Sequence, residues 1–303
     1  MGLIKSIRKL HHFWNTKRFL SNIKFLIKND FTELPDRIME DCVFELDELR
    51  DYFLSRVPSI LSKAESLTLL ADKPKSFARF GDGEVDIMQG KDCAFQKYDP
   101  LLAEKMLRVL KTRRDDLYVG INSKYFHSVL LGNQTENGRN FHRNRGRFLR
   151  EFFMREANPE IQYLDATCFL GYFFDDSDAY SEFLPMKRKL FEGRKIAVVT
   201  GKSVLEKLDY DIFDQAASKI IIDAPSRNAF SSYDEILRDI SGNVSKDTLI
   251  CLILGQTATV MAADLTDMGY LAWDTGHIAK DYDAYMKKVE ISPQAEHSFY
   301  APD

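Results

Sequence analysis

The sequence predicts an α/β protein with a Rossmann-like, mostly parallel sheet and covering helices. The main observation is four short apolar runs in the second half of the chain, each ending in Gly or Pro: KIAVVTG, KIIIDAP, TLICLILG and YLAWDTG. Helix-like segments such as SSYDEILRDI and TATVMAADLTDMG lie between them. Runs that are apolar on both faces suit buried parallel strands, because helices cover both sides of such a sheet. Ligands bind these sheets at the carboxyl ends of the strands, so the loops after these runs are the predicted site.

Length and composition indicate an ordinary globular protein. The chain has 303 residues, of which 45% are hydrophobic and 29% charged, and it suits one large α/β domain or two smaller ones. No run of about 18 or more apolar residues occurs, and the start lacks the apolar segment and cleavage site of a signal peptide. We therefore expect a cytoplasmic protein.

The first 29 residues differ in charge from the rest of the chain. They carry no acid and about +7 of charge, which leaves about −11 for the remainder. Apolar residues such as Leu3, Ile7, Leu10 and Trp14 recur at helical spacing. We expect residues 1–43 to form a basic amphipathic helical segment and residues 44–303 to form the main domain. Such a helix either lies on the anionic inner face of a membrane or packs on the main domain or a second subunit.

The elements of the first half follow from the same periodicities. FELDELRDYFLSRVPSILSKAESL predicts a helix, SFARFG a strand, PLLAEKMLRVLKTRR a helix and DLYVGIN a strand. The polar residues 123–147 predict an extended loop over a site. Arginines at its end either bind phosphate or acidic sugar or are merely solvated: Arg139, Arg143, Arg145, Arg147 and Arg150. Aromatic residues are too sparse among these charges, and the domain is too acidic, for a nucleic-acid surface.

The strongest candidate site is the bend RFGDGE, where Asp82 and Glu84 flank a glycine. Carboxylates two positions apart on an extended strand end point to the same side, and they repel each other unless a cation lies between them. Hard oxygen ligands suit Mg²⁺ or Mn²⁺. The bend therefore predicts a metal site, with a glycine-rich turn and solvated acids as the alternative.

Phosphate-binding motifs are incomplete in this chain. TGKS at residues 200–203 ends like a P-loop, but Ile196 stands where that loop needs its first glycine, and no strand is followed by GxGxxG. LGQTAT remains, a strand end followed by a helix start. Its backbone N–H groups after Gly255 and the hydroxyls of Thr257 and Thr259 either hold a phosphate or only cap the helix.

Five blocks together carry a resemblance to a known family: RFGDGE, FQKYDP, PSRNAF, SKDTLICLILGQTATVMAADL and GYLAWDTGHIAKDYDAY. In this order, over about residues 75–290, they resemble the GT-D-fold bacterial glycosyltransferases. The resemblance implies a Rossmann-like transferase with a DxE metal motif and a UDP-sugar donor, active in bacterial polysaccharide biosynthesis or protein glycosylation. Asp82 and Glu84 match the DxE pair, and His277 matches the histidine of the family's Gly-His-Ile block.

The chain departs from the family in two blocks. Where the family has an acid, a glycine, an arginine and further glycines after the strand at residues 195–201, this chain has Thr200, Leu205 and Lys207. After Gly-His-Ile the family continues with an acid and a Glu-Tyr-Glu-Trp run, whereas this chain reads AKDYDA over residues 279–284. These departures leave donor and acceptor specificity open.

Under the transferase interpretation we expect a mechanism in which metal on Asp82 and Glu84 binds the donor diphosphate. His277 would be a third metal ligand or a phosphate donor, with a purely structural histidine as the alternative. If the reaction inverts the anomeric carbon, Asp281 or Asp283 would be the general base for the acceptor hydroxyl, although an acid at the position of Asp281 can also serve only as a helix cap. The groups expected to bind the donor are Arg79, Gly81, Arg227, Gly255, Thr257 and Thr259.

Two other functions fit the predicted sheet. One is a small-molecule methyltransferase, which would need no metal and would bind its nucleoside through an acid at a strand end such as Asp223. The other is a non-catalytic, membrane-associated scaffold built on a degenerate transferase. Under the transferase interpretation the acceptor is a surface glycan, glycolipid or glycoprotein.

Overall fold

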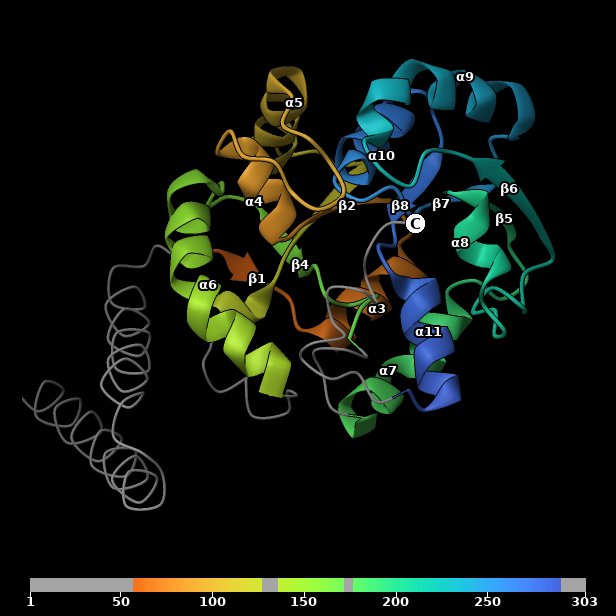
Figure 1. Cartoon of the computed structure of the whole chain (residues 1–303), viewed down its shortest axis with the longest axis horizontal. Helices are drawn as coiled ribbons and strands as arrows, with labels where there is room; N and C mark the ends of the chain where they lie inside the picture. The colour runs from red at the N-terminus through yellow and green to blue at the C-terminus, as the bar shows by residue number, and fades with distance from the viewer. Residues whose placement is uncertain (1–56, 127–135, 172–176, 290–303) are drawn as a thin grey trace, which may run out of the picture.

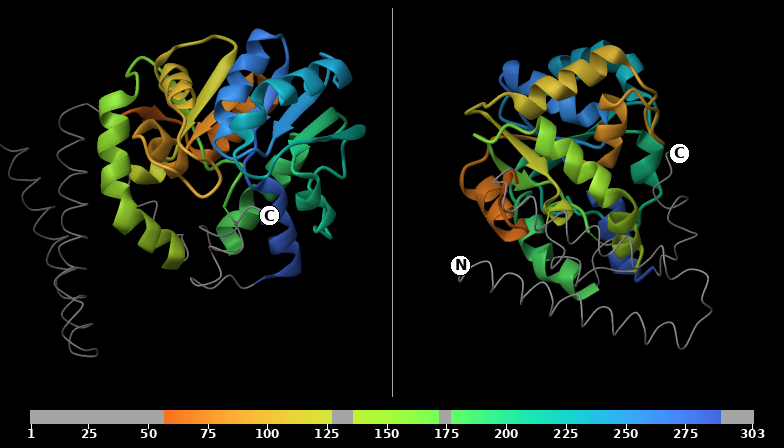
Figure 2. Two further views of the ribbon diagram at one scale, coloured as in Figure 1. Left: turned by 45° about the horizontal axis from the view of Figure 1, so that its top comes forward. Right: turned by 90° about the vertical axis from the view of Figure 1, so that its left-hand side faces the viewer.

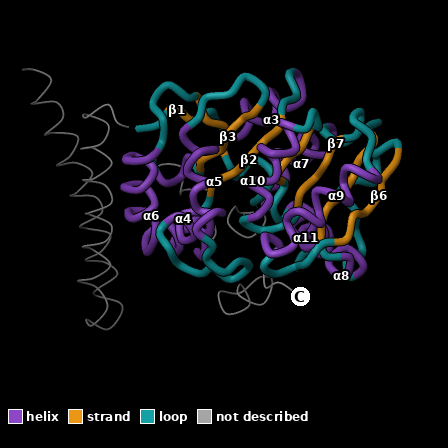
Figure 3. Tube along the Cα trace, turned by 90° about the horizontal axis from the view of Figure 1, so that it is seen from above, coloured by secondary structure: helices purple, strands orange, loops and turns teal. Residues whose placement is uncertain are grey.

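The computed structural model describes residues 57–126, 136–171 and 177–289. They form an eight-stranded sheet with the order β1-β4-β3-β2-β8-β7-β5-β6, in which every described pair of neighbours is parallel. Figure 3 shows the strands side by side, with β1 and β6 at opposite ends of the row. The predicted fold class is confirmed. The strands are β1 (Ser59–Ile60), β2 (Ser76–Phe80), β3 (Leu117–Ile121), β4 (Gln162–Asp165), β5 (Lys195–Thr200), β6 (Ser218–Asp223), β7 (Leu249–Leu252) and β8 (Leu271–Asp274).

Helices cover both faces of the sheet (Figures 1 and 2). One layer consists of α4 (Asp82–Met88), α5 (Pro100–Lys111), α6 (Glu136–Glu156), α9 (Tyr233–Asn243) and α10 (Thr257–Asp267). The opposite layer holds α3 (Lys63–Asp72), α7 (Ser177–Lys189) and α11 (Ile278–Lys287). The short helices α8 (Lys202–Glu206), η1 (Ser123–Tyr125) and η3 (Ala229–Ser232) follow strand ends.

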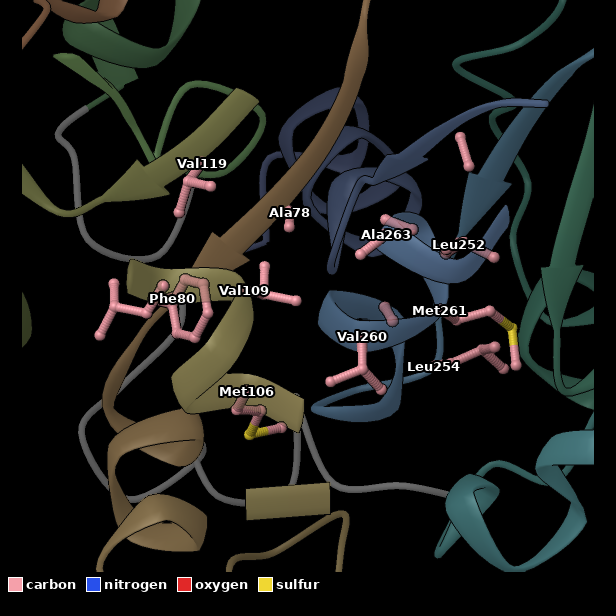
Figure 4. Packing of buried hydrophobic residues seen from close by; sticks show 14 of the residues in the cluster. Ala78, Phe80, Met106, Val109, Val119, Leu252, Leu254, Val260, Met261 and Ala263 are labelled. Carbon is pink, nitrogen blue, oxygen red and sulfur yellow. The ribbon is translucent and has the colours of Figure 1, made fainter. Parts of the chain in front are cut away.

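Two apolar cores, one on each face, hold these layers to the sheet. Both are continuous because the central strands are apolar on both sides, as the burial of every residue of β2 and β7 shows. Full burial of one large apolar side chain stabilises the fold by roughly 1.5–3 kcal/mol. Figure 4 shows part of the first core, formed by side chains of β2, α5 and α10: Ala78, Phe80, Met106, Val109, Val260 and Ala263.

Some predicted elements are wrong. The helix expected to begin at Phe44 is, in its described part, strand β1 followed by α3, whose first turn is capped by Ser62. The extended loop expected at residues 123–147 contains helix α6 from Glu136 onward. The basic segment at residues 1–43, and its boundary with the main domain, lie outside the described residues. Within the described ranges, no helix is both long and apolar enough to span a membrane.

Candidate active site

A cavity of about 330 Å³ lies at the carboxyl edge of the sheet. Residues that end or follow β2, β3, β4, β5, β7 and β8 line it, as the position of ligand sites in parallel sheets predicts. Its central part is formed by residues 79–84 with Asp274, Gly276 and His277. We call the flank beside β3 and α6 the β3 end: Asn122, Lys124, Tyr125, Phe141 and His142. The opposite flank is the β5 end: Thr200, Gly201, Val204, Ser226 and Ile253.

Asp82 and Glu84 both line the central part, but the predicted strand-end geometry is wrong. The bend is the first turn of α4, with Gly81 as N-cap, so the two acids are the first and third helical residues. Residues two positions apart on a helix point about 200° apart around its axis. Glu84 Oε2 accepts a hydrogen bond from the Gly81 N–H at 2.7 Å, as in a capping box. Both acids are placed at the end of a helix that favours negative charge.

Of the two acids of the DxE motif, Glu84 is the more deeply buried. The residue is 8% exposed. Burial, with the nearby Asp274 carboxylate as a further cause, raises the pKa of Glu84 to about 7. A bound cation would stabilise the ionised form of a buried carboxyl group such as Glu84 more than it would stabilise an exposed carboxylate.

Arg145 of α6 lies beside the two acids and contacts α4. Its Nη2 lies 2.9 Å from Asp86 Oδ1, its Nη1 donates to Asp86 Oδ2 at 3.1 Å, and Nη1 also lies 3.7 Å from Asp82 Oδ2. Of the arginines that the sequence singled out, this one therefore meets the DxE helix. Its charge compensates part of the repulsion between the acids.

Arg79 lines the cavity, but its guanidinium is committed to the protein. Nε and Nη1 donate to the backbone oxygens of Asp274 and Ala166, at 2.7 and 3.0 Å, and Nη2 donates to Asp274 Oδ1 at 2.8 Å. The expectation that Arg79 adds positive charge to the donor site stays a prediction, because the residue lines the cavity although its donors are used within the protein. The side chain ties the ends of β2, β4 and β8 together.

His277 lines the centre of the cavity as the N-cap of α11. Its ring centroid lies 5.3 Å from that of Phe95. Burial, with the charges of Lys280 and Arg79 as further causes, lowers the pKa of His277 to about 3. The ring is therefore neutral near pH 7, which suits a metal ligand or a hydrogen-bond partner and not a cationic phosphate donor.

Three predicted donor-binding residues do not line the cavity. Thr257 and Thr259 are fully buried, and their hydroxyls donate to Gln96 Oε1 at 3.2 Å and to the Arg79 backbone oxygen at 2.9 Å. Because α10 packs directly on β2, these hydroxyls form hydrogen bonds inside the protein and do not face the cavity. Arg227 is exposed after β6 and is not part of the lining. Gly81 and Gly255 do line the cavity, and Gly255 has a φ of +54°.

The predicted general bases are both buried, and neither is among the residues that line the cavity. Asp281 is 0% exposed, and its Oδ2 accepts the Gly171 N–H at 3.0 Å. Asp283 Oδ1 accepts the N–H groups of Asp209 and Tyr210 at 2.8 and 3.0 Å, while its Oδ2 pairs with Lys287 Nζ at 2.8 Å. Both carboxylates hold neighbouring segments against α11. The base hypothesis is therefore corrected for both residues.

The residues present fit a divalent ion only if a ligand completes its coordination. Among the described residues, no group of three or more His, Cys, Asp or Glu side chains could hold a metal. Two carboxylates in one cavity nevertheless match the usual Mg²⁺ arrangement, in which one or two acids and the substrate's phosphates share the ion. Asp82 and Glu84 are the residues that would hold it.

Sequence reasoning missed the β3 end. His142 accepts from Asn122 Nδ2 at 3.3 Å when its Nδ1–H donates to the Gly138 backbone oxygen at 2.7 Å. Asn122 is the last residue of the predicted strand DLYVGIN, and that position at a strand end was an available signal. His142 sits within a stretch expected to be a loop, where nothing marked it.

Comparisons with known proteins agree with the fold. The family model "Glycosyltransferase GT-D fold" matches residues 77–302. Glycosyltransferase GlyD of Streptococcus pneumoniae serotype 4 is 28% identical over 302 residues, covering 96% of this chain and 34% of the relative. Probable glycosyl transferase Gly of Streptococcus gordonii is 28% identical over 260 residues, covering 80% of this chain and 36% of the relative. The chain thus spans about a third of the length of these curated relatives.

Solved structures show the same fold. A structure of the conserved domain of unknown function 1792, described as having a distinct glycosyltransferase fold, has a TM-score of 0.71 and 31% identity, covering 80% of this chain and 86% of that one. A structure described as a new glycosyltransferase from Streptococcus sanguinis has a TM-score of 0.69 and 28% identity, with 77% and 86% covered.

Proposed function

The chain belongs to the GT-D-fold glycosyltransferase family, and we propose that it is a metal-dependent enzyme that moves a sugar from a nucleotide-sugar donor to an acceptor. We propose a UDP-sugar as donor, and a surface glycan, glycolipid or glycoprotein as acceptor. The observation that carries this proposal is that both acids of the DxE motif line one cavity into which six strand ends converge.

The chain's own residues would bind and orient the donor. Asp82 and Glu84 would hold Mn²⁺ or Mg²⁺, which supplies Lewis-acid stabilisation of the diphosphate leaving group when bound. Arg79 fixes the distance between the β2 and β8 ends, so the acids and His277 keep their relative positions. The Phe95 ring, placed against His277 and Gly255, covers one wall of the cavity and excludes water there. Asp281 and Asp283 do not line the cavity, so neither is proposed as the base for the acceptor hydroxyl.

A donor screen tests the proposal. Hydrolysis of UDP-, GDP- and TDP-sugars without acceptor is measured with Mn²⁺, with Mg²⁺ and with a chelator. We expect metal-dependent hydrolysis of a UDP-sugar that Asp82→Asn and Glu84→Gln each lower by about 10² or more, the scale of a lost electrostatic group in catalysis. Glu104→Gln, an exposed acid on α5 outside the cavity lining, is the matched control and should keep the wild-type rate. Full activity in Asp82→Asn, or hydrolysis that the chelator leaves unchanged, would contradict the mechanism.

The same assays separate the alternatives. A methyltransferase would bind S-adenosylmethionine without metal, but Asp223, the acid considered for its nucleoside, is exposed and outside the cavity lining. A non-catalytic scaffold would show no donor hydrolysis at all. Calorimetric titration with UDP and with S-adenosylmethionine distinguishes the enzyme classes.

The composition of residues 1–29 supports a peripheral contact with an anionic membrane on the cytoplasmic side. Each basic residue near an anionic surface contributes about 1 kcal/mol, and salt weakens that attraction. The full chain should sediment with phosphatidylglycerol vesicles at low salt, and Lys→Gln at positions 5, 9, 24 and 28 should release it. If the substituted chain instead changes its oligomeric state, this segment is a packing surface and the membrane proposal is wrong.

A further inference from the structure

Thr200 carries a buried hydroxyl at the edge of the cavity. It is the last residue of β5, it is 0% exposed, and it lines the β5 end. Within the described residues its Oγ1 has no hydrogen-bond partner. Its backbone is paired, because the Thr200 carbonyl accepts the Ala224 N–H at 3.0 Å. The unmatched group is therefore the side-chain hydroxyl alone.

Comparable hydroxyls near the other strand ends are paired. Thr275 Oγ1, after β8, donates to the Leu252 backbone oxygen at 3.2 Å, and Thr167 Oγ1, after β4, donates to Asp165 Oδ1 at 2.6 Å. A buried hydroxyl without a partner destabilises the folded protein, so such groups are rare and call for an explanation. At the wall of a ligand cavity, the simplest explanation is that a bound molecule supplies the partner.

The surroundings of Thr200 indicate which part of a donor would lie there. None of the five residues that define the β5 end carries a charge, whereas Arg79, Asp82 and Glu84 belong to the central part of the cavity. A Cβ on Gly201 would lie 3.2 Å from Ser226 Cβ, so glycine lets the segment that follows strand β5 approach the segment that follows strand β6 closely. A neutral, hydrogen-bonding group suits this flank better than a diphosphate does.

We propose that the β5 end binds the nucleoside of the donor and that Thr200 Oγ1 forms a hydrogen bond with it. The partner is a polar group of the nucleoside, a ribose hydroxyl or an edge of the base. This inference rests on the proposed function, because it assumes a nucleotide-sugar donor whose diphosphate lies at Asp82 and Glu84. It makes Thr200 a residue that reads the nucleoside.

Binding and stability measured on the same variants test this assignment. Thr200→Val keeps the shape and removes the hydroxyl, and Thr200→Ser keeps the hydroxyl. Titration with UDP in the presence of Mn²⁺ should show about tenfold weaker binding for Thr200→Val, which is about 1.4 kcal/mol, and a change of less than about threefold for Thr200→Ser. Inorganic pyrophosphate should bind equally to both variants and to the wild type. The melting temperature of ligand-free Thr200→Val should be unchanged or higher, because the variant removes an unpaired buried hydroxyl.

Thr248→Val is the matched control. Thr248 precedes β7 at the opposite edge of the sheet and its hydroxyl is 3.0 Å from Ser245 Oγ, so this variant should lose stability and keep UDP affinity. Unchanged UDP binding in Thr200→Val, an equal loss of pyrophosphate binding, or a lowered melting temperature like that of the control would overturn the inference. A wild type that binds none of UDP, GDP and TDP would instead contradict the proposed function.

Discussion

Arg79 and Asp274 form a buried ion pair across the junction of β2 and β8, with Arg79 Nη2 2.8 Å from Asp274 Oδ1. Asp274 Oδ1 also accepts the Gly276 N–H at 3.1 Å. Gly276 has a φ of +53°, and a Cβ there would lie 2.1 Å from Arg79 Nη2. The ion pair therefore requires glycine at position 276.

Gly276→Ala should destabilise the protein by about 2–4 kcal/mol, because the methyl group displaces one partner of a buried ion pair in a strained backbone. Urea denaturation measures the loss. Gly269→Ala is the matched control, since Gly269 has a φ of +80° and no atom within 4 Å of the added Cβ. It should cost only the backbone strain, about 1 kcal/mol. Equal losses in the two variants would show that displacement of Arg79 contributes nothing.

Glu84 should make metal-free stability fall as pH rises. Its pKa is about 7 in the folded protein and near 4.5 when unfolded, so between these values the folded state binds more protons than the unfolded state. Relative to Glu84→Gln, the free energy of unfolding of the wild type should fall by roughly 2–3 kcal/mol from pH 4.5 to pH 8. Urea denaturation in a chelator across this range measures the difference.

Gln at position 84 keeps an acceptor for the Gly81 N–H, so it isolates the titration. A difference between the two proteins that is constant with pH would show that the pKa of Glu84 is near its ordinary value. If the carboxylate holds Mn²⁺ as proposed, added Mn²⁺ should stabilise the wild type more at pH 8 than at pH 5, because protons compete for the same oxygen atoms.

His277 should not titrate near neutrality. Because its pKa lies at about 3, the ring carbon shifts in an NMR titration should stay constant from pH 5 to pH 8. The His277→Gln variant assigns the signal by its absence. A midpoint near 6.5, the value of a solvated histidine, would show that the ring is hydrated and able to carry charge at the phosphate.

The strands and the position of the site could be predicted because buried parallel strands are apolar on both faces. β4 was missed, since its four residues, QYLD, mix polar and apolar side chains. The position of Asp82 and Glu84 at a strand end was correct, yet their geometry was not. A glycine followed by Glu three positions later also marks a helix start, and here that local signal prevails.

The roles of Asp281 and Asp283 could not be predicted, because their partners are distant in sequence. Gly171 and the backbone at Asp209 and Tyr210 reach these carboxylates only through tertiary packing. The pairing of Asn122 with His142 could not be predicted for the same reason, because the two residues belong to different elements and meet at the cavity only in the folded protein. Spacing within one segment indicates a local turn or helix, and it does not show which side of a helix faces the cavity.

Asp283 should act on stability and not on the chemical step. Asp283→Ala removes one acceptor of two backbone N–H groups and the partner of Lys287, so the free energy of unfolding should fall by about 2–3 kcal/mol. Asp283→Asn keeps an oxygen for the two N–H groups and should lose less, about 1 kcal/mol. Donor hydrolysis, measured at a temperature where both variants are folded, should remain within about twofold of the wild type, since the carboxylate is outside the cavity lining. A rate that falls by about 10² in both variants at unchanged stability would restore Asp283 as a general base.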